Sequence, residues 1–403
     1  MAVPQDRPIP QPSGLTGQHL PVITNIEDLR RLARRKLPRA LFDYVDQGSY
    51  DQISYHANSD ELKSIRFRQR VLTDATDRSL ASTMLGEKVS MPVALAPTGL
   101  TGLLYGDGEM VAARVAEEMG VPFCLSTMAI CSIEDIRSAI KGPFWFQLYV
   151  FRDRGFSEEV IGRARDAGCT ALFVTVDLPM RGQRHADIKN GLVVPPRLTL
   201  RNAFDIMTKP SWALSVLMGR RKTFGNLEAY LKQSSALASG QWANDNYDAT
   251  LSWDDVAWMR KVWPGKLVLK GILDAEDAKR AASLGVDAIV VSNHGGRQLD
   301  GAPATIAALP RIADAAADRI EILFDGGVRS GQDVLKALAL GAHGCLIGRA
   351  YLYGLAAMGG DGVRKALSLI QEELKVSMSL TGVRDVRDAN PDILFDRYDG
   401  SRR

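Results

Sequence analysis

The sequence predicts an α/β fold, a (β/α)8 TIM barrel with an N-terminal helical extension and an insertion between its fourth and fifth strands. Short, apolar, β-rich runs recur eight times along the chain, and helical patterns separate most of them. Their spacing is regular except after the fourth run, where some 70 extra residues intervene. A doubly wound sheet is the alternative, but no GxGxxG follows the first run and no GxxxxGK occurs.

The eight predicted strands follow one another along most of the chain. They are VALAPTG (93–99), PFCLSTM (122–128), FWFQLYV (144–150), ALFVTVD (171–177), KLVLKGI (266–272), AIVVSNHG (288–295), EILFDGGV (321–328) and GCLIGRA (344–350). Segments between them, such as EMVAARVAEEMG and SGQDVLKALALG, have amphipathic spacing and end in the glycine that commonly closes a helix. Ahead of the first strand, NIEDLRRLARRKLPRALFDYVDQGS predicts helices that cover the lower end of the barrel.

The chain is expected to form one domain. We predict a flexible, proline-rich tail over 1–23 and a single barrel domain over 24–403, with 190–262 as the inserted segment. The N-terminus lacks a signal-peptide pattern, and no apolar run reaches the roughly 18 residues of a membrane span. Four scattered cysteines predict buried free thiols, no metal site and a cytoplasmic location. A net charge of +3 gives no indication of nucleic-acid binding.

Almost every predicted strand ends in polar residues or glycine. Because the active sites of such barrels lie at the C-terminal ends of the strands, these ends predict a site. The residues concerned are Thr98, Gly99, Ser126, Gln147, Tyr149, Thr175, Asp177, Lys270, Ser292, His294, Asp325, Gly326, Gly327, Gly348 and Arg349.

The last two strand ends, DGGVRSG and IGRA, predict a phosphate site. Glycines let backbone N–H groups approach an anion, and Arg329 or Arg349 adds a full positive charge. Tight turns with surface arginines are the alternative. Lys270, in the apolar strand LVLKGI, needs a negative partner, which the edge of a reduced flavin supplies. A flavin mononucleotide lying across the barrel mouth suits this set, although a salt bridge to a neighbouring carboxylate also suits Lys270.

His294 and Arg297 stand close together in SNHGGRQLDG, directly after a predicted strand. A histidine there suits a base near neutral pH, and a guanidinium suits a planar carboxylate. The alternative is an ordinary polar turn.

Nine motifs carry a resemblance to a known family. They are, in order, LPRALFDYVDQGSYD, APTGL, LST, FQLYV, TVDLPMRGQRHADIKN, KGI, SNHGGRQLDG, DGGVRSG and IGRA. From about residue 24 to 390 the chain resembles the FMN-dependent L-2-hydroxy-acid oxidases and dehydrogenases. The stretches FQLYVFRDRGF and KPSWALSVLMGRRKTFGN resemble bacterial respiratory L-lactate dehydrogenases most.

The resemblance implies a role for each matched residue. His294 is the expected base and Asp177 its orienting partner, while Arg297, Arg184 and Tyr44 hold the substrate carboxylate and Tyr149 contacts the substrate hydroxyl. The expected FMN contacts are Thr98, Gly99, Ser126, Gln147, Thr175, Lys270, Ser292, Asp325, Gly326, Gly327, Arg329, Gly348 and Arg349.

The resemblance also implies an activity. We expect oxidation of an L-2-hydroxy acid, L-lactate foremost, to the 2-keto acid, with electrons passed from FMN to a quinone or another non-oxygen acceptor, in a homotetramer. An oxidase that releases hydrogen peroxide and a non-catalytic flavin-binding barrel are the alternatives. Gly99 stands where glycolate oxidases have alanine, and Met128 where they have tryptophan, which indicates a softer and larger pocket.

The segment 197–222 of the insertion is unusually basic and apolar. It holds six basic residues and one acid, interleaved with Phe204, Ile206, Met207, Trp212, Leu214, Leu217 and Met218. This composition is typical of a segment that lies on anionic lipid. It predicts a peripheral membrane contact, and the alternative is a lid or subunit contact that buries the same side chains.

Overall fold

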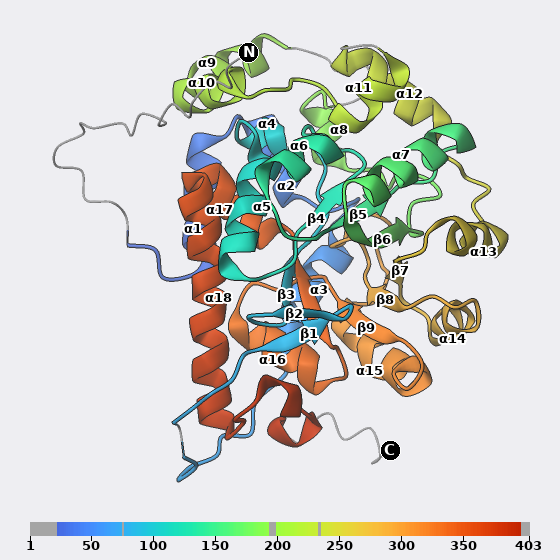
Figure 1. The fold of residues 1–403 in the computed structure, drawn as a ribbon. Helices are drawn as coiled ribbons and strands as arrows, with labels where there is room; N and C mark the ends of the chain where they lie inside the picture. The colour runs from blue at the N-terminus through green and yellow to red at the C-terminus, as the bar shows by residue number, and fades with distance from the viewer. Residues whose placement is uncertain (1–21, 75, 193–198, 233–234, 396–403) are drawn as a thin grey trace, which may run out of the picture.

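Eight strands form the centre of the computed structural model, which describes residues 22–74, 76–192, 199–232 and 235–395. They are β3 (Val93–Leu95), β4 (Cys124–Ser126), β5 (Phe144–Leu148), β6 (Cys169–Thr175), β7 (Lys266–Ile272), β8 (Ala288–Val291), β9 (Glu321–Phe324) and β10 (Gly344–Ile347). All are parallel, in the order β3-β10-β9-β8-β7-β6-β5-β4 (Figure 1). A parallel bridge between Leu95 and Phe123 joins the two ends, so the predicted TIM barrel is confirmed.

The interior of the barrel is a packed core. Side chains from the strands fill it, among them Trp145 and Phe173, whose rings stack with centroids 5.2 Å apart. The hairpin of β1 (Ser82–Met84) and β2 (Glu87–Val89) closes the lower end, with Met84 fully buried against Gly344. In the described part of the chain, the cavity that could admit a ligand lies at the upper, C-terminal ends of the strands.

The N-terminal helices lie elsewhere than we expected. α1 (Ile26–Lys36) packs on α17 (Arg349–Met358) and α18 (Gly360–Thr381), and α2 (Arg39–Asp46) brings Tyr44 to the upper end of the barrel. The prediction that these helices cover the lower end is therefore wrong, because the hairpin already occupies that place. α3 (Ile53–Ser64) packs on the outer helices α15 (Thr305–Ala316) and α16 (Gly331–Ala339).

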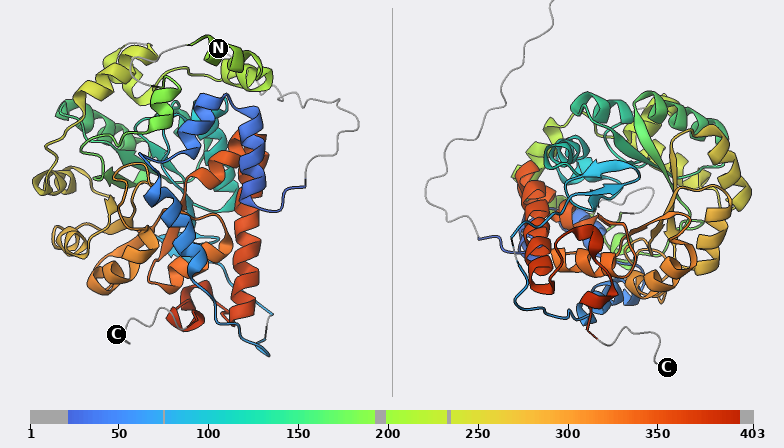
Figure 2. Two further views of the ribbon diagram at one scale, coloured as in Figure 1. Left: turned by 180° about the vertical axis from the view of Figure 1, so that it is seen from behind. Right: turned by 60° about the horizontal axis from the view of Figure 1, so that its bottom comes forward.

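Helices surround the strands as a ring, which the right-hand view of Figure 2 shows from the lower end. The others are α4 (Thr101–Leu104), α5 (Gly108–Met119), α6 (Ile133–Ala139), α7 (Arg154–Asp166), α13 (Trp253–Val262) and α14 (Ala275–Ser283). Side-chain caps fix several starts; Ser132 accepts from the Asp135 amide, and Ser330 from the Asp333 amide. The short 3-10 helices η1 (Val386–Asp388) and η2 (Pro391–Ile393) follow α18.

The segment between β6 and β7 stands over the upper end of the barrel (Figure 1). It contains α8 (His185–Lys189), α9 (Leu200–Met207), α10 (Pro210–Met218), α11 (Gly225–Leu231) and α12 (Ala236–Asn246). α10 docks tightly on the barrel, because the Trp212 indole donates to the Leu103 carbonyl at 2.8 Å and Gly106 leaves no room for a Cβ beside Ser215. α13 then precedes β7 as each ring helix precedes its strand. The predicted bounds 190–262 stay a prediction, as does the tail over 1–23, most of which lies outside the described residues.

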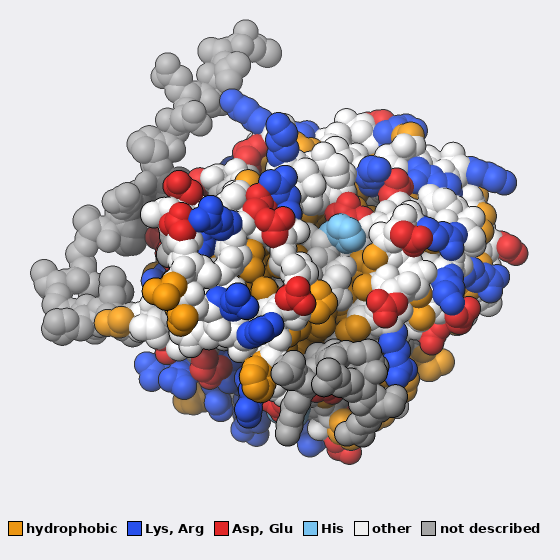
Figure 3. Space-filling view, turned by 90° about the horizontal axis from the view of Figure 1, so that it is seen from below, with side chains coloured by type: hydrophobic (Ala, Val, Ile, Leu, Met, Phe, Trp, Pro, Cys, Tyr) orange, Lys and Arg blue, Asp and Glu red, His pale blue; other side chains and the backbone are white. Residues whose placement is uncertain are grey.

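The lower face carries acidic and basic side chains mixed together (Figure 3). In the described parts of the chain, no helix combines the length and the apolar composition needed to cross a bilayer. All four cysteines are buried free thiols, and no cluster of three metal-ligating side chains occurs among the residues described.

Candidate active site

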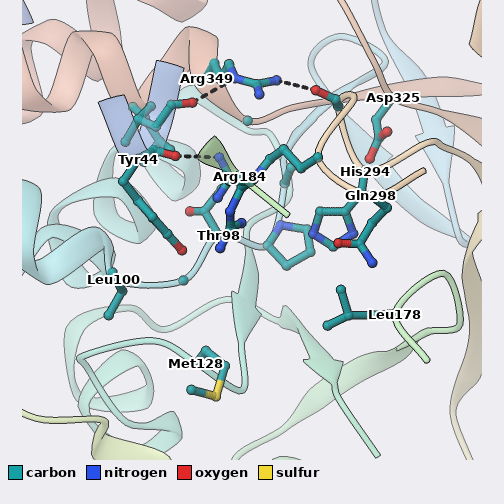
Figure 4. Close-up of a pocket in the computed structure, with 18 of the residues that line it drawn as sticks. Tyr44, Thr98, Leu100, Met128, Leu178, Arg184, His294, Gln298, Asp325 and Arg349 are labelled. Carbon is teal, nitrogen blue, oxygen red and sulfur yellow. Dashed lines mark hydrogen bonds between the residues drawn. The ribbon is translucent and has the colours of Figure 1, made fainter. Parts of the chain in front are cut away.

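A cavity of about 390 Å³ opens at the upper ends of the strands. In Figure 4, Tyr44 and Leu100 lie on one side of it, His294 and Gln298 on the other, and Arg184 between them. Most of the predicted site residues line this cavity: Tyr44, Thr98, Gly99, Tyr149, Arg184, Lys270, His294, Arg297, Asp325, Gly326, Gly327, Arg329, Gly348 and Arg349. The structure therefore brings together residues that are far apart in the sequence.

Three of the other predicted residues form a buried polar row, and the last two, Asp177 and Ser292, contact His294. Ser126 donates to Gln147 at 2.9 Å, and the Gln147 amide donates to Thr175 at 2.9 Å. These three side chains come from the adjacent strands β4, β5 and β6, whose register aligns Ser126 with Gln147. Buried polar groups that satisfy one another keep fixed orientations, so the row offers a rigid polar floor to a ligand above it.

His294 and Asp177 form a hydrogen-bonded pair at the wall of the cavity. The His294 Nδ1 atom lies 3.0 Å from Asp177 Oδ1 and 3.2 Å from Oδ2. Burial opposes ionisation of Asp177, but the neighbouring His294 and Lys270 outweigh it and lower the pKa of the carboxyl below its usual value. An ionised acceptor at Nδ1 keeps the proton there, so the Nε2 lone pair of the neutral ring is free to accept a proton.

The backbone around His294 is unusual. His294, Gly295 and Gly296 have φ angles of +57°, +65° and +72°, in the left-handed region that a non-glycine residue seldom adopts. A Cβ on Gly295 would approach Arg349 Nη1 to 2.7 Å, so the site requires glycine there. Ser292 Oγ accepts from the His294 amide at 3.0 Å and holds the turn. Strain of this kind persists where the surroundings fix it, and it commonly marks a functional site.

Lys270 is buried at the floor of the cavity with a carboxylate partner. Its Nζ lies 2.9 Å from Asp325 Oδ2 and donates to Ser292 Oγ at 2.9 Å. Burial alone lowers the pKa of Lys270, but Asp325 and Asp177 more than offset it and raise the pKa above its usual value. The salt bridge to a neighbouring carboxylate, which the sequence analysis gave as the alternative for Lys270, is thus present. Asp325 Oδ1 is also buried and has no hydrogen-bond partner among the described residues, so it can accept from a ligand.

Two glycine turns and two arginines form the far end of the cavity. Gly326 and Gly327 have φ angles of +105° and +86°, and a Cβ on either would collide with Thr305 or Asn58. Arg349 donates to the carbonyls of Val45, Gly295 and Gln47, which fixes its guanidinium. Arg329 donates to its neighbour's carbonyl through Nη1 and retains further N–H groups for a ligand. This end has the backbone room and positive charge that a phosphate requires.

The opposite end of the cavity has an excess of positive charge. Arg297 lies over the Tyr44 ring at 4.8 Å and donates to the Tyr44 carbonyl, without a carboxylate among its hydrogen-bond partners in the described chain. Burial, followed by the charge of Arg184, lowers the pKa of Arg297 to about 9. Arg184 is itself paired with Asp187 at 2.7 Å. An anionic ligand beside Arg297 would relieve this unfavourable charge.

Tyr149 completes this end with a neutral hydroxyl. Burial, with Tyr247 and the Asp177 carboxylate nearby, raises the pKa of Tyr149 well above its usual value. The phenol is therefore protonated at neutral pH and can donate a hydrogen bond.

Several lining residues were not singled out from the sequence. Arg181, Asp187 and Gln298 stand inside motifs that the resemblance used, so their positions could have been inferred. Phe224 and Tyr247 come from the segment between β6 and β7, and nothing in their sequence context indicated a cavity. Gln298 has a clear structural task, because its amide donates to the carbonyls of Asp177 and Met180 and so joins two loops of the site.

The barrel combines a histidine–carboxylate pair, a cationic pocket beside it and a glycine-lined anion site opposite. These features define the class of cofactor-dependent barrel enzymes that act on small acids. Comparison with known proteins identifies the family. Residues 33–396 match the family FMN-dependent dehydrogenase, and the chain belongs to that family.

Curated relatives cover nearly the whole chain. The L-lactate dehydrogenase of Caulobacter vibrioides (strain NA1000 / CB15N) is 49% identical over 378 residues, which are 93% of this chain and 98% of the relative. That of Vibrio parahaemolyticus serotype O3:K6 is 47% identical over 375 residues, with 93% and 99% covered. Among solved structures, the monotopic membrane protein (S)-mandelate dehydrogenase has a TM-score of 0.89 at 36% identity, with 93% of this chain and 99% of that chain covered.

The residues present fit the FMN that this family uses. The unpartnered Asp325 Oδ1 can accept from a hydroxyl of the ribityl chain, and the glycine turns with Arg329 suit the phosphate. Lys270 lines the cavity, and the polar row of Ser126, Gln147 and Thr175 stands on the neighbouring strands β4, β5 and β6, so polar partners for a flavin ring are present at this end of the barrel.

Proposed function

We propose that the chain oxidises an L-2-hydroxy acid, L-lactate foremost, to the 2-keto acid, with His294 as the base. The observation that carries this function is the His294–Asp177 pair in the same cavity as the uncompensated Arg297. The L-lactate dehydrogenases among its relatives support lactate as the substrate.

The chain's own residues bind and orient the acid. Arg297 offers a planar fork to the substrate carboxylate, with Arg184 and Tyr44 beside it. Tyr149 donates to the substrate hydroxyl. His294 Nε2 accepts a proton from the substrate, and Asp177 stabilises the imidazolium that results. FMN, when bound, accepts the two electrons that the substrate loses.

We assign FMN binding to two groups of residues. The phosphate group consists of Arg329 and Arg349 with the glycine turns at Gly326, Gly327 and Gly348. The residues assigned to the flavin ring and the ribityl chain are Thr98, Gly99, Ser126, Gln147, Thr175, Lys270, Ser292 and Asp325.

Anaerobic spectroscopy of the purified protein tests this function. The spectrum shows whether a flavin is bound, and successive addition of L-lactate, glycolate and L-mandelate shows which acid bleaches it. We expect L-lactate to reduce the flavin fastest. A bound flavin that none of the three acids reduces would favour the non-catalytic barrel.

The electron acceptor is the second part of the proposal. We propose a quinone, with an oxidase that releases hydrogen peroxide as the competing function. Turnover with a soluble quinone under argon, compared with peroxide formation in air, separates them. Faster turnover in air, with one peroxide for each acid oxidised, would establish the oxidase.

We also propose that α9 and α10 rest on the cytoplasmic face of a membrane. Six apolar side chains of this region are exposed: Leu200, Phe204, Met207, Leu214, Leu217 and Met218. Trp212 is half-buried and anchors α10 to the barrel. The six exposed side chains are not covered by the described part of the chain. Basic residues among them attract anionic lipid, each adding about 1 kcal/mol. The neighbour described as a monotopic membrane protein supports a peripheral contact.

Liposome binding tests the membrane contact. We expect salt-sensitive binding to anionic vesicles, which is lost when 197–222 is replaced by a Gly/Ser linker and weakened in a Leu214→Ser, Leu217→Ser double variant. Val376→Ser with Leu380→Ser, two comparably exposed positions on α18, is the matched control. Equal binding by both double variants would leave the segment as a lid or subunit contact. Light scattering of the same preparations tests the proposed homotetramer.

A further inference from the structure

We propose that Arg181 and Tyr247 form a second anion subsite at the substrate end of the cavity, which binds the distal carboxylate of an L-2-hydroxy diacid. The inference rests on the proposed function and narrows its substrate class.

Arg181 lines the same cavity as His294 and Arg297. Its guanidinium carbon lies 5.0 Å from the centre of the Tyr247 ring, in a cation–π contact. The phenol thereby holds the guanidinium at the rim of the cavity, where it is exposed to solvent and to an incoming ligand.

The loop that carries Arg181 is fixed to the catalytic loop. Gly182 donates to the Gln298 side chain at 3.3 Å, and Gln298 donates back to the carbonyls of Asp177 and Met180. A Cβ on Gly182 would lie 2.6 Å from the Arg297 carbonyl, so the two loops touch along their backbones. This contact sets Arg181 at a constant position relative to Arg297.

Tyr247 is held as firmly from the other side. It pairs with Phe151 in an antiparallel bridge, and its ring packs edge-on to that of Tyr149 with centroids 5.9 Å apart. Tyr149 is the proposed contact of the substrate hydroxyl. The subsite therefore lies one aromatic ring away from the group that would contact the substrate hydroxyl.

The charges at this end exceed what a monoacid needs. Of the three arginines Arg181, Arg184 and Arg297, only Arg184 forms an ion pair within the described chain, with Asp187. The carboxylate of a monoacid compensates Arg297 and leaves Arg181 without an anion. A second carboxylate on the substrate would compensate it, in a bidentate contact of the kind that guanidinium groups favour.

The oxidation itself is unchanged in this proposal. The substrate loses two electrons and two protons, one proton from its hydroxyl carbon and one from its hydroxyl oxygen. His294 would take one proton, and the electrons with the other proton would pass to FMN, when bound, as they do for lactate. The distal carboxylate takes no part in bond making, so its contribution appears in binding and orientation.

Stopped-flow reduction of the holoenzyme under argon tests the subsite. The probes are L-lactate and the L-2-hydroxy diacids malate, 2-hydroxyglutarate and 2-hydroxyadipate, whose lengths vary the reach to Arg181. We expect at least one diacid to reduce the flavin, and Arg181→Leu to lower its kcat/KM about tenfold or more while that of lactate changes less than about twofold. Arg181→Lys should restore part of the loss, and Tyr247→Phe should lower diacid efficiency alone.

Arg311→Leu, at an exposed arginine of α15 outside the cavity, is the matched control and should leave every acid unchanged. Reduction by lactate with no response to any diacid, or an equal fall for lactate and diacid in Arg181→Leu, overturns the subsite and leaves the proposed function standing. Failure of lactate and all diacids to reduce the wild type overturns both.

Discussion

Arg297 and Arg349 donate hydrogen bonds to the same atom, the Gln47 carbonyl oxygen, at 3.4 and 3.1 Å. They also bind the neighbouring carbonyls, Arg297 that of Tyr44 and Arg349 that of Val45. These carbonyls lie at the C-terminal end of α2, where a helix favours positive charge. The proposed substrate anchor and a proposed phosphate anchor are thus positioned by one helix end.

Asp46 holds this helix end, and its loss should disturb both anchors. The buried carboxylate accepts from Arg30 at 2.6 and 2.7 Å and from the Tyr353 hydroxyl at 2.7 Å. Asp46→Ala should lower the free energy of unfolding by about 2 kcal/mol, because it leaves two donors unpaired. The same substitution should weaken FMN binding, measured by fluorescence titration, and raise KM, measured by steady-state kinetics. Asp60→Asn, at an exposed ion pair of α3, is the control and should change none of the three.

His294→Gln should retain FMN and lose about 10²- to 10⁴-fold in the rate of flavin reduction. The proposed FMN contacts come from other side chains, so the absorbance of the bound flavin should be preserved. His185→Gln, at a histidine that packs on Tyr50 outside the cavity, is the control. A reduction rate equal to that of the wild type would remove His294 from its proposed role.

Arg297→Lys should raise KM and lower kcat. Lysine keeps the charge but loses the planar fork, so the carboxylate is held less firmly and the hydroxyl carbon is misplaced. Steady-state kinetics with L-lactate measure both effects. The control is Arg280→Lys, at an arginine of α14 that lies over the Trp253 ring. Unchanged constants for Arg297→Lys would assign this arginine to the support of α2 alone.

Gly99→Ala should narrow the cavity. The added Cβ would lie 3.2 Å from the Met128 carbonyl oxygen and 3.7 Å from the Tyr44 hydroxyl. We expect KM to rise more for L-mandelate than for L-lactate, because the larger acid needs the space that the methyl group removes. Equal changes for the two acids would show that Gly99 does not limit the size of the substrate.

The fold could be predicted because its signals are local. Each strand is a short apolar run, and each run ends where polar residues must face the barrel mouth, as Gln147 on β5 and Lys270 on β7 do. The family follows from motifs such as SNHGGRQLDG, whose three consecutive left-handed residues no ordinary turn requires. The FMN-dependent family and the barrel are therefore confirmed, while the individual roles stay predictions.

The remainder depends on contacts between distant segments. Nothing in the neighbourhood of Tyr247 indicates that it packs on Tyr149, about a hundred residues earlier in the chain. The partners of Arg349 could not be predicted from the sequence either, because its three carbonyl acceptors belong to the end of α2 and to the loop of His294. The N-terminal helices were misplaced for the same reason: their amphipathic pattern shows that they pack, but the hairpin at the lower end decides where.

Glu109 should make stability depend on pH in a direction unusual for a carboxylate. It is buried in α5, accepts from the Ile130 amide at 2.9 Å through Oε1, and has no hydrogen-bond partner at Oε2 within the part of the chain that the structure describes. Burial raises the pKa of this carboxyl above its usual 4.5, so the folded protein keeps a proton that the unfolded chain releases. The free energy of unfolding should therefore decrease as the pH rises from 4.5 through the raised pKa. The decrease is at most about 1.4 kcal/mol per pH unit for one proton.

Glu109→Gln removes this proton and keeps the acceptor for Ile130. The Tm of the variant should therefore increase relative to that of the wild type as the pH rises above 4.5. Glu118→Gln, on the exposed side of the same helix, is the opposing control. The ion pair with Arg364 lowers the pKa of Glu118, so its stabilisation is present above the unfolded pKa and is lost as the pH falls. Calorimetric scans of the three proteins between about pH 3 and about pH 8 measure both differences. A constant Tm difference between Glu109→Gln and the wild type would show that Glu109 is ionised throughout and that its burial is compensated.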